Sequence, residues 1–177
     1  DFYLNRGLSK MGERFWEEDE VPASSAPFKP LAIRILDKDG NVSDSVRSVD
    51  PVTIEIEYEL NEDVTGLRVG YYLFTTRGEA VFTSFDTDSE QLFREYTARP
   101  KCVYTSRCKI PAHTLNEGRF VLGVNASSYR IRRYFQDDQA LSFSVDASGA
   151  AGTQWPEPRP GAVRPALEWK IEERGRA

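Results

Sequence analysis

Residues 51–60, PVTIEIEYEL, decide the fold of this chain. Apolar side chains occupy every even position from 52 to 60, and Thr53, Glu55, Glu57 and Glu59 occupy the odd positions between them. Successive side chains of a strand point to opposite faces of a sheet, so this alternation predicts a strand with one buried and one solvated face. Such strands are typical of antiparallel sheets that pack on one side only.

The same period of two recurs along most of the chain, with turn residues such as Asp37-Lys38-Asp39-Gly40 between the segments. The further strands that it predicts cover residues 31–37, 67–76, 80–86, 102–110, 119–127, 140–146 and 162–171. About eight short strands without a long helix predict an all-β fold rather than βαβ units. We therefore expect an immunoglobulin-like or jelly-roll antiparallel β-sandwich.

The first thirty residues differ from the rest. Apolar residues recur there at helical spacing, at Leu4, Leu8, Met11 and Phe15. A proline- and serine-rich stretch, VPASSAPFKP, follows at 21–30. We expect a short helix or linker over 1–30 and a β-sandwich domain over 31–177.

The length and the net charge of the chain limit the functions that it can have. A chain of 177 residues forms one domain by default. Its net charge of −5 argues against a general nucleic-acid binder, which needs a basic surface to neutralise phosphates. No apolar stretch approaches the roughly 20 residues of a membrane span. The chain starts at Asp1 rather than Met, so we expect it to be a piece of a longer protein.

The two cysteines, Cys102 and Cys108, fall within one predicted strand. Six residues of extended chain separate their Cα atoms by roughly 20 Å, whereas a disulfide needs less than about 7 Å. We expect two free thiols, which fit a reducing cytoplasm.

No pattern in the chain indicates catalysis, a cofactor or a metal. There is no glycine-rich phosphate loop, and the single histidine, His113, is expected to be an ordinary loop residue. Asp86, Asp88 and Glu90 alternate as calcium ligands do, but without the glycine and final glutamate of such a loop, so we favour a solvated hairpin loop. A carboxylate pair for glycoside hydrolysis stays open, since its separation is a three-dimensional quantity.

Several strings, in this order, resemble the C-terminal domain of the ATP-binding subunit (Wzt type) of O-antigen polysaccharide ABC exporters. They are LDKDGNV (36–42), TTRGEAVFTSFDTDS (75–89), CVYTSRCKIPAHTLNEGRFVLGVNAS (102–127), DDQALSFSVD (137–146) and GAVRPALEW (161–169). The resemblance implies a non-catalytic β-sandwich that recognises the end of a lipid-linked polysaccharide. It also implies an upstream ATPase domain and a membrane subunit as partners, and a cytoplasmic place at the inner membrane.

The strands at 67–76, 119–127 and 140–146 are expected to be neighbours in one sheet, and their outer face is a candidate for a sugar site. Tyr72 and Phe74 would form an aromatic wall, while Gly70, Gly123 and Ser142 would leave room for a sugar ring. The carbohydrate-binding residues predicted on this face are Arg68, Tyr72, Phe74, Asn125 and Ser142.

A second candidate is the basic, aromatic segment YRIRRYF at 129–135. Tyr129 and Arg133 are its predicted contributions to sugar binding, since guanidinium groups suit carboxylate or phosphate. The alternative is a surface loop whose arginines offset the net negative charge.

The end of the chain predicts a homodimer. A glycine- and proline-rich arm at 147–161 leads to the strand-like segment 162–171. A strand on a semi-rigid arm can pair with its own sheet or exchange with that of a second copy, which would hide an open sheet edge.

Two other functions stay open. An immunoglobulin-like adaptor would bind a protein through a sheet edge or the same outer face. A glycoside-processing enzyme would release a product, whereas a binding domain would not.

Overall fold

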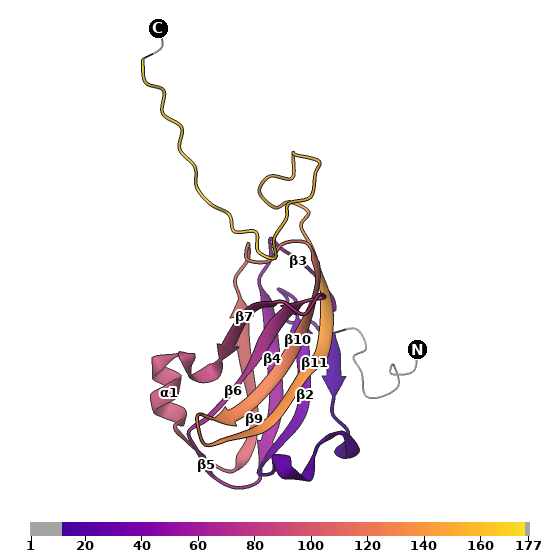
Figure 1. The fold of residues 1–177 in the computed structure, drawn as a ribbon, viewed down its shortest axis with the longest axis vertical. Coiled ribbons are helices and arrows are strands. Elements are labelled where there is room, and N and C mark those ends of the chain that lie inside the picture. The colour runs from indigo at the N-terminus through magenta and orange to yellow at the C-terminus, as the bar shows by residue number, and fades with distance from the viewer. Residues whose placement is uncertain (1–11, 176–177) are drawn as a thin grey trace.

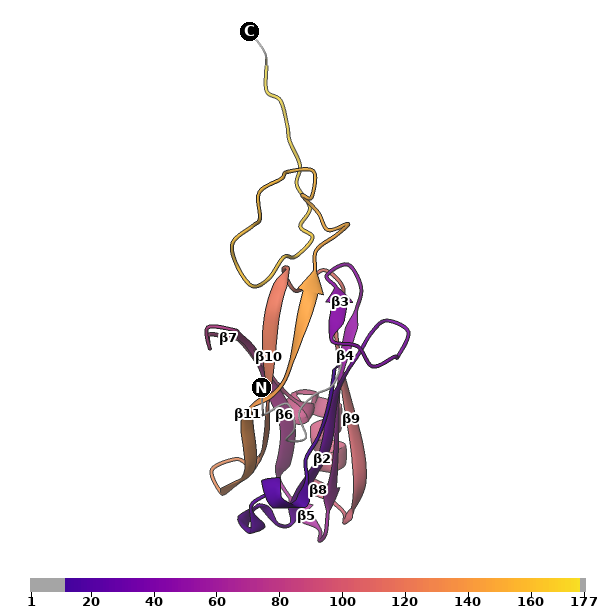
Figure 2. The same cartoon turned by 90° about the vertical axis from the view of Figure 1, so that its right-hand side faces the viewer.

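The computed structural model describes residues 12–175, most of whose strands form two large sheets packed face to face (Figure 1). The first sheet has the order β1 (Glu13–Phe15), β2 (Phe28–Leu36), β4 (Val52–Leu60) and β9 (Cys102–Ile110). The second has the order β3 (Ser45–Arg47), β11 (Arg132–Asp146), β10 (Gly118–Ser128), β6 (Leu67–Thr75) and β7 (Ala80–Phe85). Figure 2 shows the two layers from the side. The predicted β-sandwich is confirmed.

The core lies between the layers and follows the alternation in the sequence. In β4, Ile54, Ile56 and Tyr58 are buried, and the ring of Tyr58 stacks on those of Phe28 and Tyr104 at centroid distances of 5.0 and 5.3 Å. Burial raises the pKa of Tyr58 to about 12, against the opposing charge of a neighbouring arginine. The ring of Phe28 also stacks on that of Phe135 in β11, with centroids 6.2 Å apart, so aromatic rings from both sheets fill the space that a disulfide spans in some sandwiches.

The predicted strands up to residue 146 are all present, but residues 162–171 do not form a strand. Only Val163 forms an isolated bridge, with Leu115. Pro165 cannot donate a ladder hydrogen bond, which explains why the pairing ends there. The tail then runs away from the sandwich (Figure 1), with Trp169 87% exposed.

Residues 12–30 differ from the short helix or linker expected there, because they contain a strand, two 3-10 turns and the start of β2. Leu4, Leu8 and Met11 lie outside the described residues, but Phe15 lies in β1, which pairs with β2 through Phe15 and Ala32. Trp16, directly after it, is buried in the core. Two short 3-10 turns, η2 (Glu18–Glu20) and η3 (Ala23–Ser25), connect β1 to β2.

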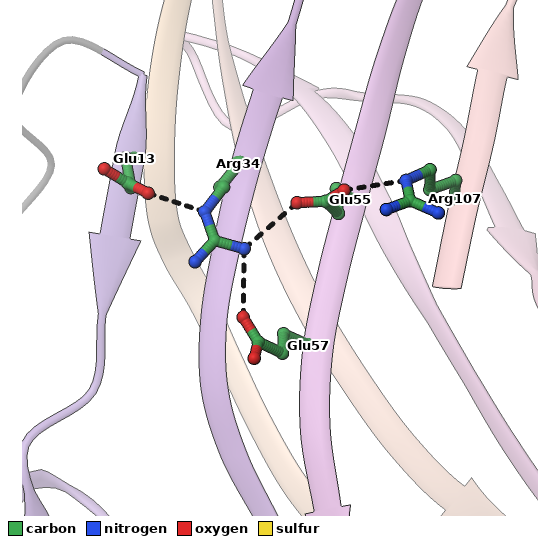
Figure 3. Close-up of polar contacts among 5 residues, drawn as sticks. All are labelled: Glu13, Arg34, Glu55, Glu57 and Arg107. Carbon is green, nitrogen blue, oxygen red and sulfur yellow. Dashed lines mark hydrogen bonds and ion pairs between the residues drawn. The ribbon is translucent and has the colours of Figure 1, made fainter. Parts of the chain in front are cut away.

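An ion network on the outer face of the first sheet links the edge strand β1 to β2, β4 and β9 (Figure 3). Arg34 donates to Glu13 at 2.5 Å and to Glu55 and Glu57 at 3.0 Å each, and Arg107 donates to Glu55 at 2.7 Å. Burial lowers the pKa of Arg34, but the hydrogen bonds to the three carboxylates outweigh it, and the pKa is raised. The charges on this face largely satisfy one another, so the outer face of the other sheet is the better candidate for a binding site.

The segment predicted as a solvated hairpin loop carries a short helix, α1 (Glu90–Tyr96), after a 3-10 turn, η4 (Asp86–Asp88). The three residues of the calcium-like pattern have separate protein partners: Asp86 pairs with Arg99, Asp88 accepts from a backbone N–H, and Glu90 pairs with Arg94. No group of side chains in the described part of the chain is suited to hold a metal.

A two-stranded sheet of β5 (Val64–Thr65) and β8 (Ala98–Arg99) closes one end of the sandwich. Cys102 and Cys108 both lie on β9 and are free thiols, as their spacing predicts. No helix within residues 12–175 is long and apolar enough to cross a membrane.

Candidate functional site

The three strands expected to share an outer face are neighbours in the second sheet. β10 pairs with β6 on one side and β11 on the other, placing Ser127 opposite Arg68 and Gly123 opposite Tyr72. Tyr71 and the other inward residues of β6 are buried, whereas Arg68 and Tyr72 are partly exposed on the other face. The face assignment from the sequence is confirmed for β6.

An open hollow of about 410 Å³ lies on this outer face, where the β10–β11 hairpin turns. It brings together Arg68, Tyr72, Asn125, Tyr129 and Arg133. The sequence divided these residues between a strand face and a separate loop. Residues of both candidates line this one hollow. The basic segment enters β11 at Arg132, so the β10–β11 hairpin brings it next to the end of the strand face.

The other two predicted residues lie outside the hollow. Phe74 lies beside Tyr72, with ring centroids 5.9 Å apart, and extends the aromatic surface along β6. Ser142 lies further along β11 and accepts a hydrogen bond from Arg119 at 3.0 Å, and Ser144 accepts another from the same guanidinium group.

The glycines do not form the expected trough. A Cβ at Gly70 would lie 2.0 Å from the backbone oxygen of Ser84, and one at Gly123 would lie 3.0 Å from the Cα of Asp138. Both glycines instead allow another stretch of backbone to approach closely. The room for a ligand therefore lies nearer the hairpin than these glycines predict.

A chain of hydrogen bonds forms the polar floor of the hollow. Asn125 donates to Gln136 at 3.2 Å and accepts from Ser127 at 3.1 Å, while Arg133 donates to the same oxygen of Gln136 at 3.0 Å. Asn125 and Ser127 are buried on rigid strand β10, so their positions are fixed before any ligand arrives.

The sequence missed Gln136 as a lining residue because the strand predicted at 140–146 begins at Arg132 in the structure. Ser127 was missed although it lies in the predicted strand 119–127, two residues after Asn125, where alternation puts it on the same face. Asp137 and Asp138 resemble a turn, but β11 passes through them with a register shift opposite Leu122 and Val124. YRIRRYF gave little signal, because Phe135 is buried but Tyr129 and Ile131, in phase with it, are 61% and 78% exposed.

The wall of the hollow combines aromatic rings with guanidinium groups. Arg68 lies 4.2 Å from the ring centroid of Phe85 and 5.2 Å from that of Tyr129, and its Nε donates to Ser127 at 3.3 Å. Arg130, at the hairpin turn, lies 5.3 Å from the Tyr129 ring and donates to its hydroxyl. The lining residues include no histidine, cysteine or carboxylate, so the hollow offers donors and flat apolar faces but no general base.

A second cavity, of about 450 Å³, opens between the sheets beside α1. Its inner polar groups bind one another: Arg99 donates to Tyr58 and Asp86, and the hydroxyl of Tyr71 lies 3.3 Å from the sulfur of Cys108. These pairs belong to the packing of the core, which makes the outer hollow the better candidate for a ligand site.

The two packed sheets place the chain in the class of β-sandwich domains, with an open hollow of tyrosine, arginine and amide side chains on one sheet face. Residues 30–155 match the Wzt C-terminal domain family, so the chain belongs to that family. A crystal structure of the C-terminal domain of Wzt has the same fold, with a TM-score of 0.68 at 10% identity, over 97% of this chain and 95% of that one. The comparison with curated proteins found no match.

Proposed function

We propose that the domain binds carbohydrate in the outer hollow, without chemistry of its own, and recognises the end of a lipid-linked O-antigen polysaccharide. The observation that carries the proposal is the meeting of Tyr72 and Tyr129 with Asn125 and the arginines in one open hollow, in a chain of this family. A sugar has apolar C–H faces and a polar rim. An aromatic surface beside amide and guanidinium donors suits both.

The expected affinity is modest. The hollow is open and a few groups contact the ligand, so we expect a dissociation constant nearer micromolar than nanomolar, or about 5 to 8 kcal/mol. The rigid strands and the existing hydrogen bonds of Asn125 limit the ordering cost of binding.

The family supports a place for the domain in an O-antigen ABC exporter. We propose that it acts there beside an ATPase domain and a membrane subunit, on the cytoplasmic side and peripheral to the inner membrane. Its own residues supply recognition, and the energy for export would come from the ATPase.

A glycan array probed with the purified domain tests the proposal. We expect retention of polysaccharide ends with no release of product over time. Turnover of a bound glycan would instead indicate a glycoside-processing enzyme. An array without any retained glycan, together with a protein partner from a pull-down, would favour the adaptor function.

We also propose a homodimer in which C-terminal tails are exchanged. Leu167, Trp169 and Ile171 are largely exposed on a tail that leaves its own sandwich, and apolar side chains of this size favour burial. Light scattering at tens of micromolar should give twice the mass of the chain. A monomeric mass would contradict the proposal, and loss of the dimer on replacing Trp169 and Ile171 with serine would locate the contact.

A further inference from the structure

Resting on the proposed function, we propose that Arg14 and Trp16 are positioning residues for the hollow, which they hold from the far side of β11. Neither side chain lines the hollow. Both belong to β1 or follow it directly, and β1 is the first strand of the described chain. In the proposed exporter, β1 is the strand nearest the upstream ATPase domain, so these contacts would couple glycan binding to that side of the domain.

The ladder between β10 and β11 is interrupted directly beside the hollow. Asp137 and Leu141 of β11 both pair with β10. Residues 138–140 lie between them, but only Gly123 lies between their partners on β10. Such a bulge bends its strand and leaves the extra residues without ladder partners. Side-chain contacts at the bulge therefore help to set the hairpin half of β11 relative to its other half.

Arg14 contacts both sides of this bulge. Its Nη1 lies 3.2 Å from the carboxylate of Asp137 and donates to the backbone oxygen of Ala140 at 3.4 Å. Its other terminal nitrogen pairs with Glu20 at 3.2 Å, in the turn that follows β1. Arg14 is 8% exposed, so salt and water screen these ion pairs little.

Trp16 binds the same carboxylate. Its indole N–H donates to Asp137 at 3.0 Å, and its ring meets that of Phe135 edge-on, with centroids 5.6 Å apart. The other carboxylate oxygen of Asp137 accepts from the N–H of Gln139, inside the bulge, at 3.1 Å. Asp137 thus joins β1 to the bulge through both of its oxygens.

The polar floor of the hollow begins one residue away, at Gln136. The side-chain oxygen of Gln136 accepts from Asn125 and from Arg133. Its amide nitrogen donates to Asp138 at 2.7 Å, so a bulge residue determines which end of this amide faces the floor. A shift of the bulge would therefore move an acceptor that two residues of the hollow use.

A second attachment joins the same parts of the chain at the hairpin. Arg132 donates to the backbone oxygens of Ser24 and Ala26, in the connection between β1 and β2. The segment from β1 to β2 thus contacts the hairpin half of β11 at both of its ends. Because coupling between two sites is reciprocal, a ligand that fixes this half of β11 would also stabilise the docking of β1.

Hydrogen exchange followed by NMR on the purified full chain tests the positioning without a glycan. We expect Arg14→Met to speed the exchange of the backbone amides of residues 133–137 at least about tenfold, and to shift the side-chain amide signals of Asn125 and Gln136. Trp16→Phe keeps a ring beside Phe135 and removes the N–H donor, so it should give the same local pattern more weakly. Arg14→Lys should restore part of the protection, since it keeps the charge but not the planar fork.

Lys29→Met is the matched control. It removes a positive charge from the same end of the chain, but Lys29 pairs with Glu18 rather than with β11. Because that pair is exposed, the exchange rates at 133–137 should change less than about twofold. The ladder between β4 and β9 reports the stability of the whole domain. Equal acceleration on β4 and at 133–137 in Arg14→Met would show a purely structural role and overturn the proposal.

The glycan most strongly retained on the array gives the second measurement. Its binding should shift the indole N–H signal of Trp16, and Arg14→Met should weaken it about tenfold, whereas Lys29→Met should stay within about twofold of the wild type. Unchanged glycan affinity in Arg14→Met would overturn the coupling. If the array retains no glycan but Arg14→Met loosens residues 133–137 alone, the proposed function fails and the positioning of the β11 wall stands.

Discussion

Replacing Asp86 with alanine should lower the free energy of unfolding by about 3 to 5 kcal/mol, because it leaves a buried positive charge without its carboxylate. Arg99 is only 2% exposed, and it donates to Asp86 at 2.9 Å, to the hydroxyl of Tyr58 at 2.7 Å and to the oxygen of Leu67 at 3.0 Å. Asp86 also accepts from the N–H of Val69 at 3.1 Å, so the change removes a backbone bond as well.

Arg99 cannot avoid this cost by losing its proton. Burial lowers the pKa of Arg99, but the charge of Asp86 and the contact with Tyr58 outweigh burial and raise it. The guanidinium group therefore stays charged at any pH at which the domain folds, so Asp86→Ala lowers the free energy of unfolding by the full cost of an unpaired buried charge.

Asp88→Ala is the matched control for this change. Asp88 is a carboxylate in the same turn but is exposed, and it accepts only from the N–H of Phe85. Its removal should cost about 1 kcal/mol or less. Urea unfolding of Asp86→Ala and Asp88→Ala measures the difference in stability. Equal urea midpoints would show that the buried Asp86–Arg99 pair does not stabilise the position of β8.

Tyr71→Ala should also cost about 3 to 5 kcal/mol of stability. The side chain of Tyr71 is 2% exposed between the sheets, its ring contacts that of Phe82 with centroids 6.0 Å apart, and burial raises the pKa of its hydroxyl. Alanine there would leave a void beside the existing cavity under α1, of which Tyr71 is a lining residue.

Tyr72→Ala, one residue along the same strand, should cost about 1 kcal/mol, because its ring lies on the outer face and loses only contacts with Phe74 and Phe85. Thermal melts should therefore give a clearly lower melting temperature for Tyr71→Ala than for Tyr72→Ala. Comparable destabilisation by both would contradict the assignment of faces on β6.

The strand faces could be predicted from the sequence because each is a local property of alternation. Ile54 and Tyr71 are buried where the period of two puts them. The strand predicted at 162–171 was wrong because alternation shows which face a side chain would take, but not whether the segment pairs with a sheet. Pro165 removes a donor, and the described part of the chain offers the segment only the single bridge at Val163.

The assembly of the candidate site could not be predicted from the sequence, because it depends on pairing between strands that are far apart in the chain. Arg68 and Tyr129 are far apart in the sequence, and only the pairing of Ser127 with both Arg68 and Arg133 brings them to one hollow. The same pairing brings backbone onto Gly70 and Gly123, which a single strand considered alone presents as open space. The residue types of the site were therefore visible in the sequence, but their assembly was not.

Calorimetric titration of an array-selected oligosaccharide into wild type and Tyr72→Ala tests the central claim most directly. We expect micromolar binding by the wild type and a loss of about 1 to 3 kcal/mol in the variant, the value of burying one aromatic side chain, with the fold retained. Unchanged binding by Tyr72→Ala would contradict carbohydrate binding in the hollow on the outer face of β6, β10 and β11.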